Sequence, residues 1–241
     1  MHDMHCHLAF MSNGEDVAAE AQAENTLLFA NTVTMDEYET ARKRFEAYDN
    51  VRVGLGTHPW WVDDSFDAAR FEKLANRERF IGEIGLDLGR RHEENRQAQL
   101  DAFNTAIGIC AHQENKVVSL HAVHASAEVL GALERTGALQ TCMCIFHWFT
   151  GPSDLLKRAI LAGCRFSVGP RMLATGKGRE YVKAIPAQCL LLETDAPPQQ
   201  GQRYSYAELR AELEGAADTI AAIKGESALE IIEQNARTLL A

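Results

Sequence analysis

The chain has 241 residues, of which 46% are hydrophobic, and a formal net charge of −10 at pH 7. It is long enough to bury a sizeable core, and the absence of any run of eighteen apolar residues excludes a transmembrane helix. The acidic balance argues against a protein that grips nucleic acid through a broad basic face, although metal ions could still hold phosphate locally. The first expected strand begins at once and leaves no room for a signal peptide, and the 6 cysteines include no Cys-x-x-Cys pair. We therefore expect a cytoplasmic protein with free thiols.

Eight apolar stretches recur along the chain, and helix-like segments separate most of them. The stretches, which we expect to be strands, cover residues 2–8, 27–33, 51–58, 80–87, 116–121, 141–147, 164–168 and 189–195. The expected helices cover about 36–47, 63–76, 93–114, 125–135, 153–162, 205–217 and 226–239. Residues 170–185, which include Gly176-Lys177-Gly178, are expected to form a mobile loop.

Alternation of strands and helices implies βαβ units and a parallel sheet. Eight such units, at intervals of roughly 20 to 35 residues, predict a TIM-type (β/α)8 barrel. We expect one domain over residues 1–241, because no linker or repeat divides the chain. A doubly wound open sheet is the alternative fold. It is disfavoured because no Gly-x-Gly-x-x-Gly motif follows an early strand.

The first strand carries two histidines in alternation. Side chains alternate faces along a strand, so Asp3, His5 and His7 share one face. Two imidazoles and a carboxylate are costly to bury unless a divalent cation binds them. A single His-x-His pair is also common on protein surfaces, so further ligands must decide between these readings.

Further polar residues lie where the other strands end. In a barrel of this type the chemistry takes place at the carboxyl ends of the strands. The residues at these ends are His5, His7, His58, Glu83, His121, His147 and Asp195. An acid within an apolar run must be neutralised, paired or bound to a metal. Taken together, the set predicts a metal site.

The remaining polar residues are weaker candidates. His92 and His112 lie on or beside the long expected helix and are expected to be solvated. His124 follows three residues after His121 and has only a small chance of lining the site. Asp87 shares a strand face with Glu83 and could orient a ligand.

An ordered set of motifs extends from residue 3 to about 197. They are Asp3-Met4-His5-Cys6-His7, Gly56-Thr57-His58-Pro59, Ile81-Gly82-Glu83-Ile84-Gly85-Leu86-Asp87, His121, His147-Trp148-Phe149-Thr150-Gly151 and Leu192-Glu193-Thr194-Asp195-Ala196-Pro197. This set resembles the TatD family of metal-dependent hydrolases, a group of amidohydrolase-like barrels. Asn235-Ala236-Arg237 is similar to the C-terminal motif of the same family.

The resemblance implies two divalent metal ions per subunit, which could be zinc, manganese or magnesium. The first ion would be held by His5, His7 and Asp195, and the second by His121 and His147, with Glu83 bridging the two. A hydroxide shared by the ions would attack a DNA phosphodiester, and Asp195 would act as general base. The resemblance thus implies a deoxyribonuclease that binds DNA locally. We expect it to be a monomer without membrane contacts.

Three departures from the family pattern concern the substrate. Trp60 stands where a second histidine is common, and Val123 where an arginine is common. Leu88 and Gly89 replace the usual tyrosines. All three departures bear on the substrate rather than on the metal.

Phosphate contacts must then come from other residues. We expect His58 beside the site, and Arg90 or Arg171 from loops, to supply them. Trp60 and Trp61 could stack on the bases of single-stranded nucleic acid, although packing under a loop is about equally plausible for such a pair.

Two alternative functions remain open from the sequence. The same metal cage could act on a small phosphoester, lactone or amide, because the departures affect substrate positions. A non-catalytic protein with structural metals is the other alternative. It is disfavoured by an acid placed for proton transfer.

Overall fold

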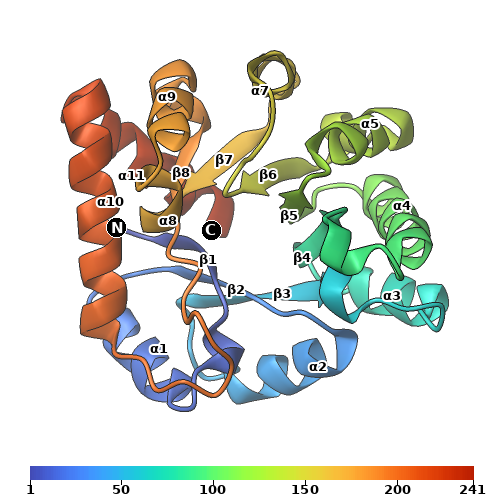
Figure 1. Ribbon diagram of the computed structural model, residues 1–241. Coiled ribbons are helices and arrows are strands. Elements are labelled where there is room, and N and C mark those ends of the chain that lie inside the picture. The colour runs from blue at the N-terminus through green and yellow to red at the C-terminus, as the bar shows by residue number, and fades with distance from the viewer. The chain divides into compact units, whose positions relative to one another are not determined.

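The computed structural model describes residues 1–241, and its eight strands alternate with helices (Figure 1). The strands follow chain order in one sheet and are β1 (Asp3–Cys6), β2 (Leu28–Asn31), β3 (Val51–Thr57), β4 (Phe80–Asp87), β5 (Val117–Val123), β6 (Met143–His147), β7 (Arg165–Val168) and β8 (Leu190–Leu192). This is the (β/α)8 arrangement of TIM-type barrels, as predicted. That the whole chain acts as one domain stays a prediction.

The helices lie between and after the strands. The α-helices are α1 (Gly14–Ala23), α2 (Met35–Arg44), α3 (Ala68–Ala75), α4 (Arg96–Gln113), α5 (Ser126–Thr136), α6 (Ala138–Thr141), α7 (Ser153–Leu161), α8 (Pro170–Leu173), α9 (Gly176–Ala184), α10 (Tyr206–Lys224) and α11 (Ser227–Leu240). Four short 3₁₀ turns are η1 (Leu8–Phe10), η2 (Pro59–Trp61), η3 (Arg90–His92) and η4 (Ala187–Cys189). None of the helices combines the length and the hydropathy of a membrane span.

The prediction of a mobile loop at 170–185 is wrong, because this segment forms α8 and α9. The Thr175 hydroxyl caps α9 by accepting a hydrogen bond from the Gly178 amide at 2.9 Å. A Cβ atom on Gly178 would lie 2.0 Å from the Met172 carbonyl oxygen. This glycine therefore serves a close backbone approach rather than flexibility.

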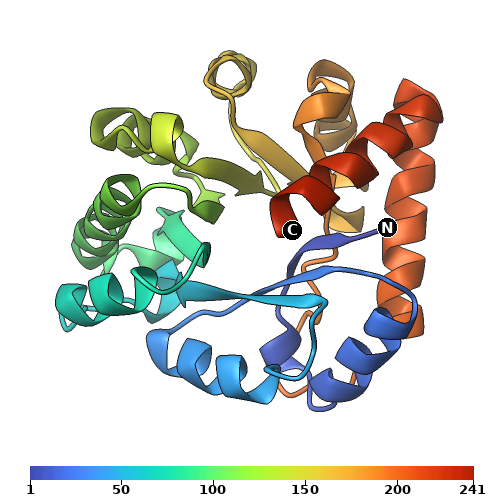
Figure 2. The same cartoon turned by 180° about the vertical axis from the view of Figure 1, so that it is seen from behind.

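The chain forms two compact units, and the first contains both chain ends. Unit 1 consists of Met1–Asn31, Thr40–Val53 and Phe166–Ala241. Within it β1 pairs with β2, β7 pairs with β8, and α10 and α11 pack on each other and on β8 (Figure 2).

The chain that follows β8 returns to β1 within unit 1. The Asp195 amide donates to the His5 carbonyl at 2.8 Å, and the His7 amide donates to the Ala196 carbonyl at 2.7 Å. These two bonds place the residues after β8 beside the end of β1. The first and last strands of the chain therefore end next to each other.

Unit 2 consists of Thr32–Glu39 and Gly54–Arg165. In it β4 pairs with β5 and β5 pairs with β6, all in parallel, while α3, α4 and α5 follow one another beside these strands (Figure 1). Gly85 is opposite His121, where a Cβ atom would lie 2.0 Å from the His121 carbonyl oxygen. Leu120 is opposite Phe146, so His121, the next residue of β5, lies beside His147 at the end of β6. The register thus brings the ends of β4, β5 and β6 together.

Candidate metal centre

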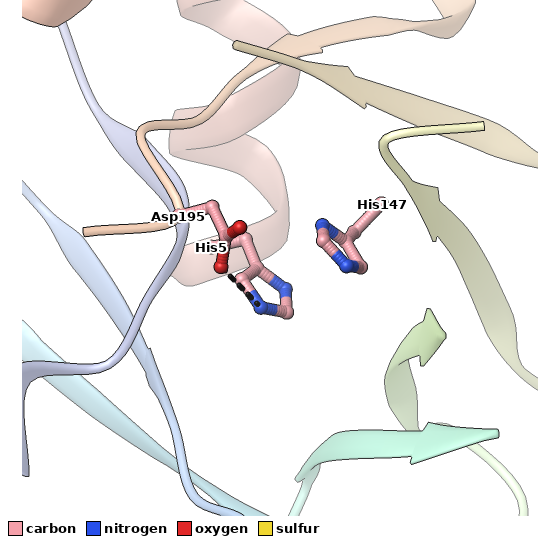
Figure 3. A group of neighbouring side chains, drawn as sticks. All are labelled: His5, His147 and Asp195. Carbon is pink, nitrogen blue, oxygen red and sulfur yellow. Dashed lines mark ion pairs between the residues drawn. The ribbon is translucent and has the colours of Figure 1, made fainter. Parts of the chain in front are cut away.

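The first ligand group, defined as His5, His7 and Asp195, assembles within unit 1. The Nε2 atoms of His5 and His7 are 3.4 Å apart. Oδ1 of Asp195 lies 3.4 Å from His7 Nε2 and 3.9 Å from His5 Nε2. Figure 3 shows the Asp195 carboxylate turned to the His5 imidazole, with their ion pair drawn as a dashed line. Ligands about 2.1 Å from a tetrahedral ion lie about 3.4 Å from one another, so the spacing fits one cation.

A backbone carbonyl orients one of these imidazoles. His7 Nδ1 lies 3.2 Å from the carbonyl oxygen of Asn31, the last residue of β2. Donation from Nδ1 to this oxygen leaves the lone pair on Nε2, the nitrogen that faces Asp195. The contact with Asn31 therefore leaves Nε2 of His7 as the nitrogen that could bind a metal.

Asp3 joins the two segments that carry the first ligand group. Its Oδ1 accepts hydrogen bonds from the amides of His5 and Thr194, both at 3.1 Å, and its Oδ2 accepts from the Thr194 hydroxyl at 2.6 Å. Complete burial raises the pKa of Asp3 to about 7, against the opposing effect of the Thr194 hydrogen bond. Asp3 thus fixes the position of the segment that leads into Asp195.

The backbone of Asp195 is in an uncommon conformation. Its φ is 56°, in the left-handed region that residues other than glycine rarely occupy but that aspartate tolerates. Oδ2 of Asp195 accepts a hydrogen bond from Nη1 of Arg171, just after β7, at 2.9 Å. The carboxylate is therefore held by an arginine on one oxygen and faces two imidazoles with the other.

The second ligand group, defined as Glu83, His121 and His147, assembles within unit 2. Its centre is Oε1 of Glu83, which lies 2.5 Å from Nδ1 of His121 and 3.2 Å from Nε2 of His147. His147, also labelled in Figure 3, is the last residue of β6. The Glu83 side chain is only 2% exposed, so its charge requires a cation or protonated imidazoles nearby.

His58, which we expected to bind substrate, lies close to this second group. Its Nε2 is 3.7 Å from Oε1 of Glu83, and its ring centroid is 4.5 Å from that of His121. His58, Glu83 and His121 each offer one donor atom within 4.8 Å of the others. The strand-end pattern includes His58 in the predicted metal site, whereas we expected its role to be a contact with the substrate phosphate.

Asp87 lies on the far side of His121, as its strand parity indicated. Nε2 of His121 is buried, makes no hydrogen bond, and lies 3.9 Å from Oδ2 of Asp87. Burial by itself would lower the pKa of His121, but the negative charges of Glu83 and Asp87 outweigh it and raise this pKa above its usual value. For Asp87, burial acts in the opposite direction and would raise the pKa. The interactions of Asp87 with His121, the Trp60 indole and the Gly89 amide outweigh burial and hold the Asp87 pKa below its usual range.

The two groups offer the donor chemistry of a divalent metal site. Imidazole nitrogens and carboxylate oxygens together suit zinc, manganese and related ions, and no thiolate takes part. The buried Nε2 atom of His121, which makes no hydrogen bond, is a further donor. The residues present therefore fit divalent cations.

The other residues expected to bind substrate occupy the surroundings of these groups. Trp60 is 52% exposed on η2, and Arg90 is exposed on η3. Arg171 contacts the first ligand group through Asp195. Trp60 and Arg90 belong to 3₁₀ turns and Arg171 to the short helix α8, and each of these elements follows a strand, where specificity residues of such barrels are expected.

The expectation that His92 is solvated holds only in part, because its side chain is 24% exposed. Its ring stacks on Trp60, with centroids 5.3 Å apart and an interplanar angle of 13°, and its Nε2 lies 3.7 Å from Oδ2 of Asp87. Helix periodicity could not reveal this, because His92 precedes α4 and belongs to η3. The nearby strand end at Asp87 was the only available sequence signal.

Comparison with known proteins gives a consistent result. The family model described as "TatD related DNase" matches residues 2–241. Deoxyribonuclease TATDN3 of Homo sapiens is 27% identical over 265 residues, covering 99% of this chain and 92% of its own. The 3'-5' ssDNA/RNA exonuclease TatD of Dickeya dadantii is 33% identical over 199 residues, covering 78% and 74%.

Two more similarities extend over nearly the whole chain. The uncharacterized metal-dependent hydrolase YabD of Bacillus subtilis is 30% identical over 256 residues, covering 97% of this chain and 99% of its own. The crystal structure of YJJV, a TatD homologue from Escherichia coli, matches with a TM-score of 0.81 at 21% identity and covers 99% and 97%. The structural match confirms the TIM-type fold. From the match of the family model over residues 2–241, we conclude that the chain belongs to the TatD related DNase family.

Proposed function

We propose that the protein is a metal-dependent deoxyribonuclease that hydrolyses phosphodiester bonds in DNA. The observation that carries the proposal is the environment of Glu83, whose Oε1 has three imidazole nitrogens within 3.7 Å. Relatives named deoxyribonuclease and ssDNA/RNA exonuclease support the substrate class.

The proposed centre holds two divalent ions. We assign His5, His7 and Asp195 to the first ion and His121 and His147 to the second, with Glu83 bridging. When bound, the ions supply Lewis-acid polarisation of a phosphoryl oxygen and lower the pKa of water at the site. His58 is either a further ligand or a donor to the scissile phosphate.

Asp195 is the proposed general base. Its side chain is 17% exposed, so it can return an accepted proton to solvent, which the buried Glu83 cannot readily do. The hydrogen bond from Arg171 fixes the orientation of the carboxylate. The same guanidinium is exposed and can contact a substrate phosphate.

We propose local binding of DNA by a monomer. With a net charge of −10, phosphate attraction must come from bound cations and a few arginines such as Arg90 and Arg171. None of the 6 cysteines forms a disulfide bond, which supports a reducing compartment such as the cytoplasm.

The test is a metal-dependent cleavage assay. Protein stripped with EDTA is reloaded with zinc, manganese or magnesium and offered labelled single-stranded DNA, a chromogenic phosphodiester and a lactone. We expect DNA cleavage that requires metal, and metal analysis that gives two ions per chain. Turnover of the lactone or the small ester without any on DNA would overturn the proposal.

A matched pair of variants controls the assay. Glu83→Gln removes the charge at the proposed bridge. Glu78→Gln removes another buried acid of unit 2, one that accepts a hydrogen bond from the Tyr38 hydroxyl at 2.9 Å. Only the Glu83 variant is expected to lose cleavage.

A further inference from the structure

Two neighbouring tryptophans form an exposed aromatic surface in unit 2. Trp60 and Trp61 of η2 are 52% and 46% exposed, while most large hydrophobic side chains of the protein are buried. Their ring centroids are 6.0 Å apart at an interplanar angle of 30°. Exposed indoles beside a polar centre typically mark a binding surface.

A third ring extends this surface. His92 stacks on Trp60 at 5.3 Å and 13°, so His92, Trp60 and Trp61 form a series of nearly parallel rings that we call the ring platform. The centroid distances exceed the separation of face-to-face rings, so the rings are offset and leave indole surface open.

The ring platform is fixed to the second ligand group. The Trp60 indole nitrogen donates to Oδ2 of Asp87 at 2.8 Å, and the same carboxylate lies 3.9 Å from Nε2 of His121. The Trp60 ring centroid is 5.1 Å from that of His58 and 6.2 Å from that of His121. A planar group on the platform would therefore lie directly beside the proposed metal ligands.

A small cavity borders the same surface. Its volume is about 220 Å³, and it is lined by Trp61, Val33, Thr57 and Phe66 among others. Pockets for drug-sized ligands begin at about 300 Å³, so this one suits a single ring system. Three acids, Asp36, Asp63 and Asp67, also line it, against one arginine, Arg70, that is already paired with Asp36. The net negative charge would repel phosphate, so the favoured occupant is a base rather than the backbone.

We infer that the ring platform is a stacking subsite for one unpaired nucleobase next to the scissile phosphodiester; this inference rests on the proposed function. Every base has a π face, so stacking selects single-stranded DNA over duplex without selecting a sequence. Trp60 and Trp61 contact the base, and Asp87 positions Trp60.

The first experiment measures binding without hydrolysis. Trp148→Phe leaves Trp60 and Trp61 as the fluorophores, since the chain has 3 tryptophans. This protein is titrated in EDTA with an octathymidylate and with an abasic oligonucleotide of the same length. We expect quenching by the octathymidylate and roughly 5- to 150-fold weaker binding of the abasic chain. Equal affinity for the two would overturn the inference.

The second experiment removes the platform. Fluorescence anisotropy of labelled oligonucleotides gives the affinity ratio between base-bearing and abasic chains for each variant. The ratio should fall towards one in Trp60→Ala/Trp61→Ala and remain unchanged in Trp148→Phe. Retention of the full ratio in the double variant would contradict the assignment of the base to these indoles.

The role of Asp87 is tested by a conservative rescue. Asp87→Asn keeps an oxygen that can accept from the Trp60 indole, while Asp87→Ala removes it. We expect the affinity ratio to persist in the first variant and to fall at least threefold in the second. Equal ratios in the two variants would refute a positioning role.

Failure of the subsite and failure of the proposed function have different signatures. Metal-dependent cleavage of DNA with no preference for base-bearing chains would overturn the subsite alone. Base-dependent quenching in EDTA, with no cleavage under any metal, would overturn the nuclease activity and leave the subsite standing.

Discussion

The two ligand groups bury their acids to very different degrees. The Glu83 side chain is 2% exposed and lies among imidazoles on neighbouring strands of unit 2. The Asp195 side chain is 17% exposed, follows the last strand of unit 1, and accepts a hydrogen bond from Arg171. One carboxylate is enclosed by positive or metal-binding partners, and the other is reached by solvent.

This difference assigns the two acids different tasks. A buried carboxylate is stable only while a cation balances it, which suits a permanent ligand. A carboxylate near solvent can gain a proton and pass it on, which suits a general base. The sequence pattern places both acids at strand ends and does not distinguish them, whereas their different burial assigns them different roles.

The largest effect is expected from Glu83→Gln. Loss of the charge at the centre of three imidazoles should lower metal content and reduce kcat on DNA on the order of 10³-fold. Metal analysis and steady-state kinetics measure both quantities, with Glu78→Gln as the buried-acid control in the same unit. Full metal content in Glu83→Gln would contradict the role of Glu83 as a ligand.

Asp195→Asn should separate proton transfer from metal retention. We expect kcat to fall by about 10²- to 10⁴-fold, as for loss of a general base, while the second group still takes up an ion. The measurement pairs kcat with metal stoichiometry in one preparation. If Asp195→Asn and Glu83→Gln lose metal to the same extent, the distinction between the two acids is wrong.

A smaller effect is expected from Arg171→Ala. Removal of an exposed guanidinium near the base should raise KM about tenfold and reduce the slope of log KM against log salt by about one unit. Arg203→Ala is the matched control, since Arg203 is an exposed arginine of unit 1 that lies 3.8 Å from Asp16. A similar KM increase in both variants would indicate a general charge effect.

The smallest effect is a proton released when metal enters the second group. The pKa of His121 is raised in the absence of metal, so this imidazole keeps its proton to a higher pH than a free histidine does. Metal binding requires the neutral ring and must displace that proton. Near pH 6.5, metal binding should release up to about one more proton per chain than at pH 9. An indicator dye measures the released protons. Equal release at both pH values would exclude a raised His121 pKa.

The sequence located the strands that carry the proposed ligands better than it located the surroundings of those residues. The stretch 80–87 matches β4, because an uninterrupted apolar run around Glu83 marks a buried strand. The expected end of the sixth strand at His147 coincides with the end of β6, whereas β5 continues two residues beyond the expected end at His121. Strands can be located from sequence because runs of apolar residues and the alternation of side chains are properties of the local sequence.

The ring platform and the helices after β7 could not be predicted from local sequence. Stacking of His92 on Trp60 depends on how η2 and η3 are placed, and no periodicity encodes that placement. At 176–178 the glycines indicated a loop, although Gly178 is needed for close packing against Met172. In both cases tertiary contacts determine the outcome and local preference does not.

The first ligand group joins residues from near the two ends of the chain, His5 at the start and Asp195 after the last strand. A chain emerging from the ribosome therefore carries both histidines long before it carries their carboxylate partner. Ion uptake by that group must wait until translation has passed the eighth strand. Any product that terminates earlier lacks both this ligand and the proposed base.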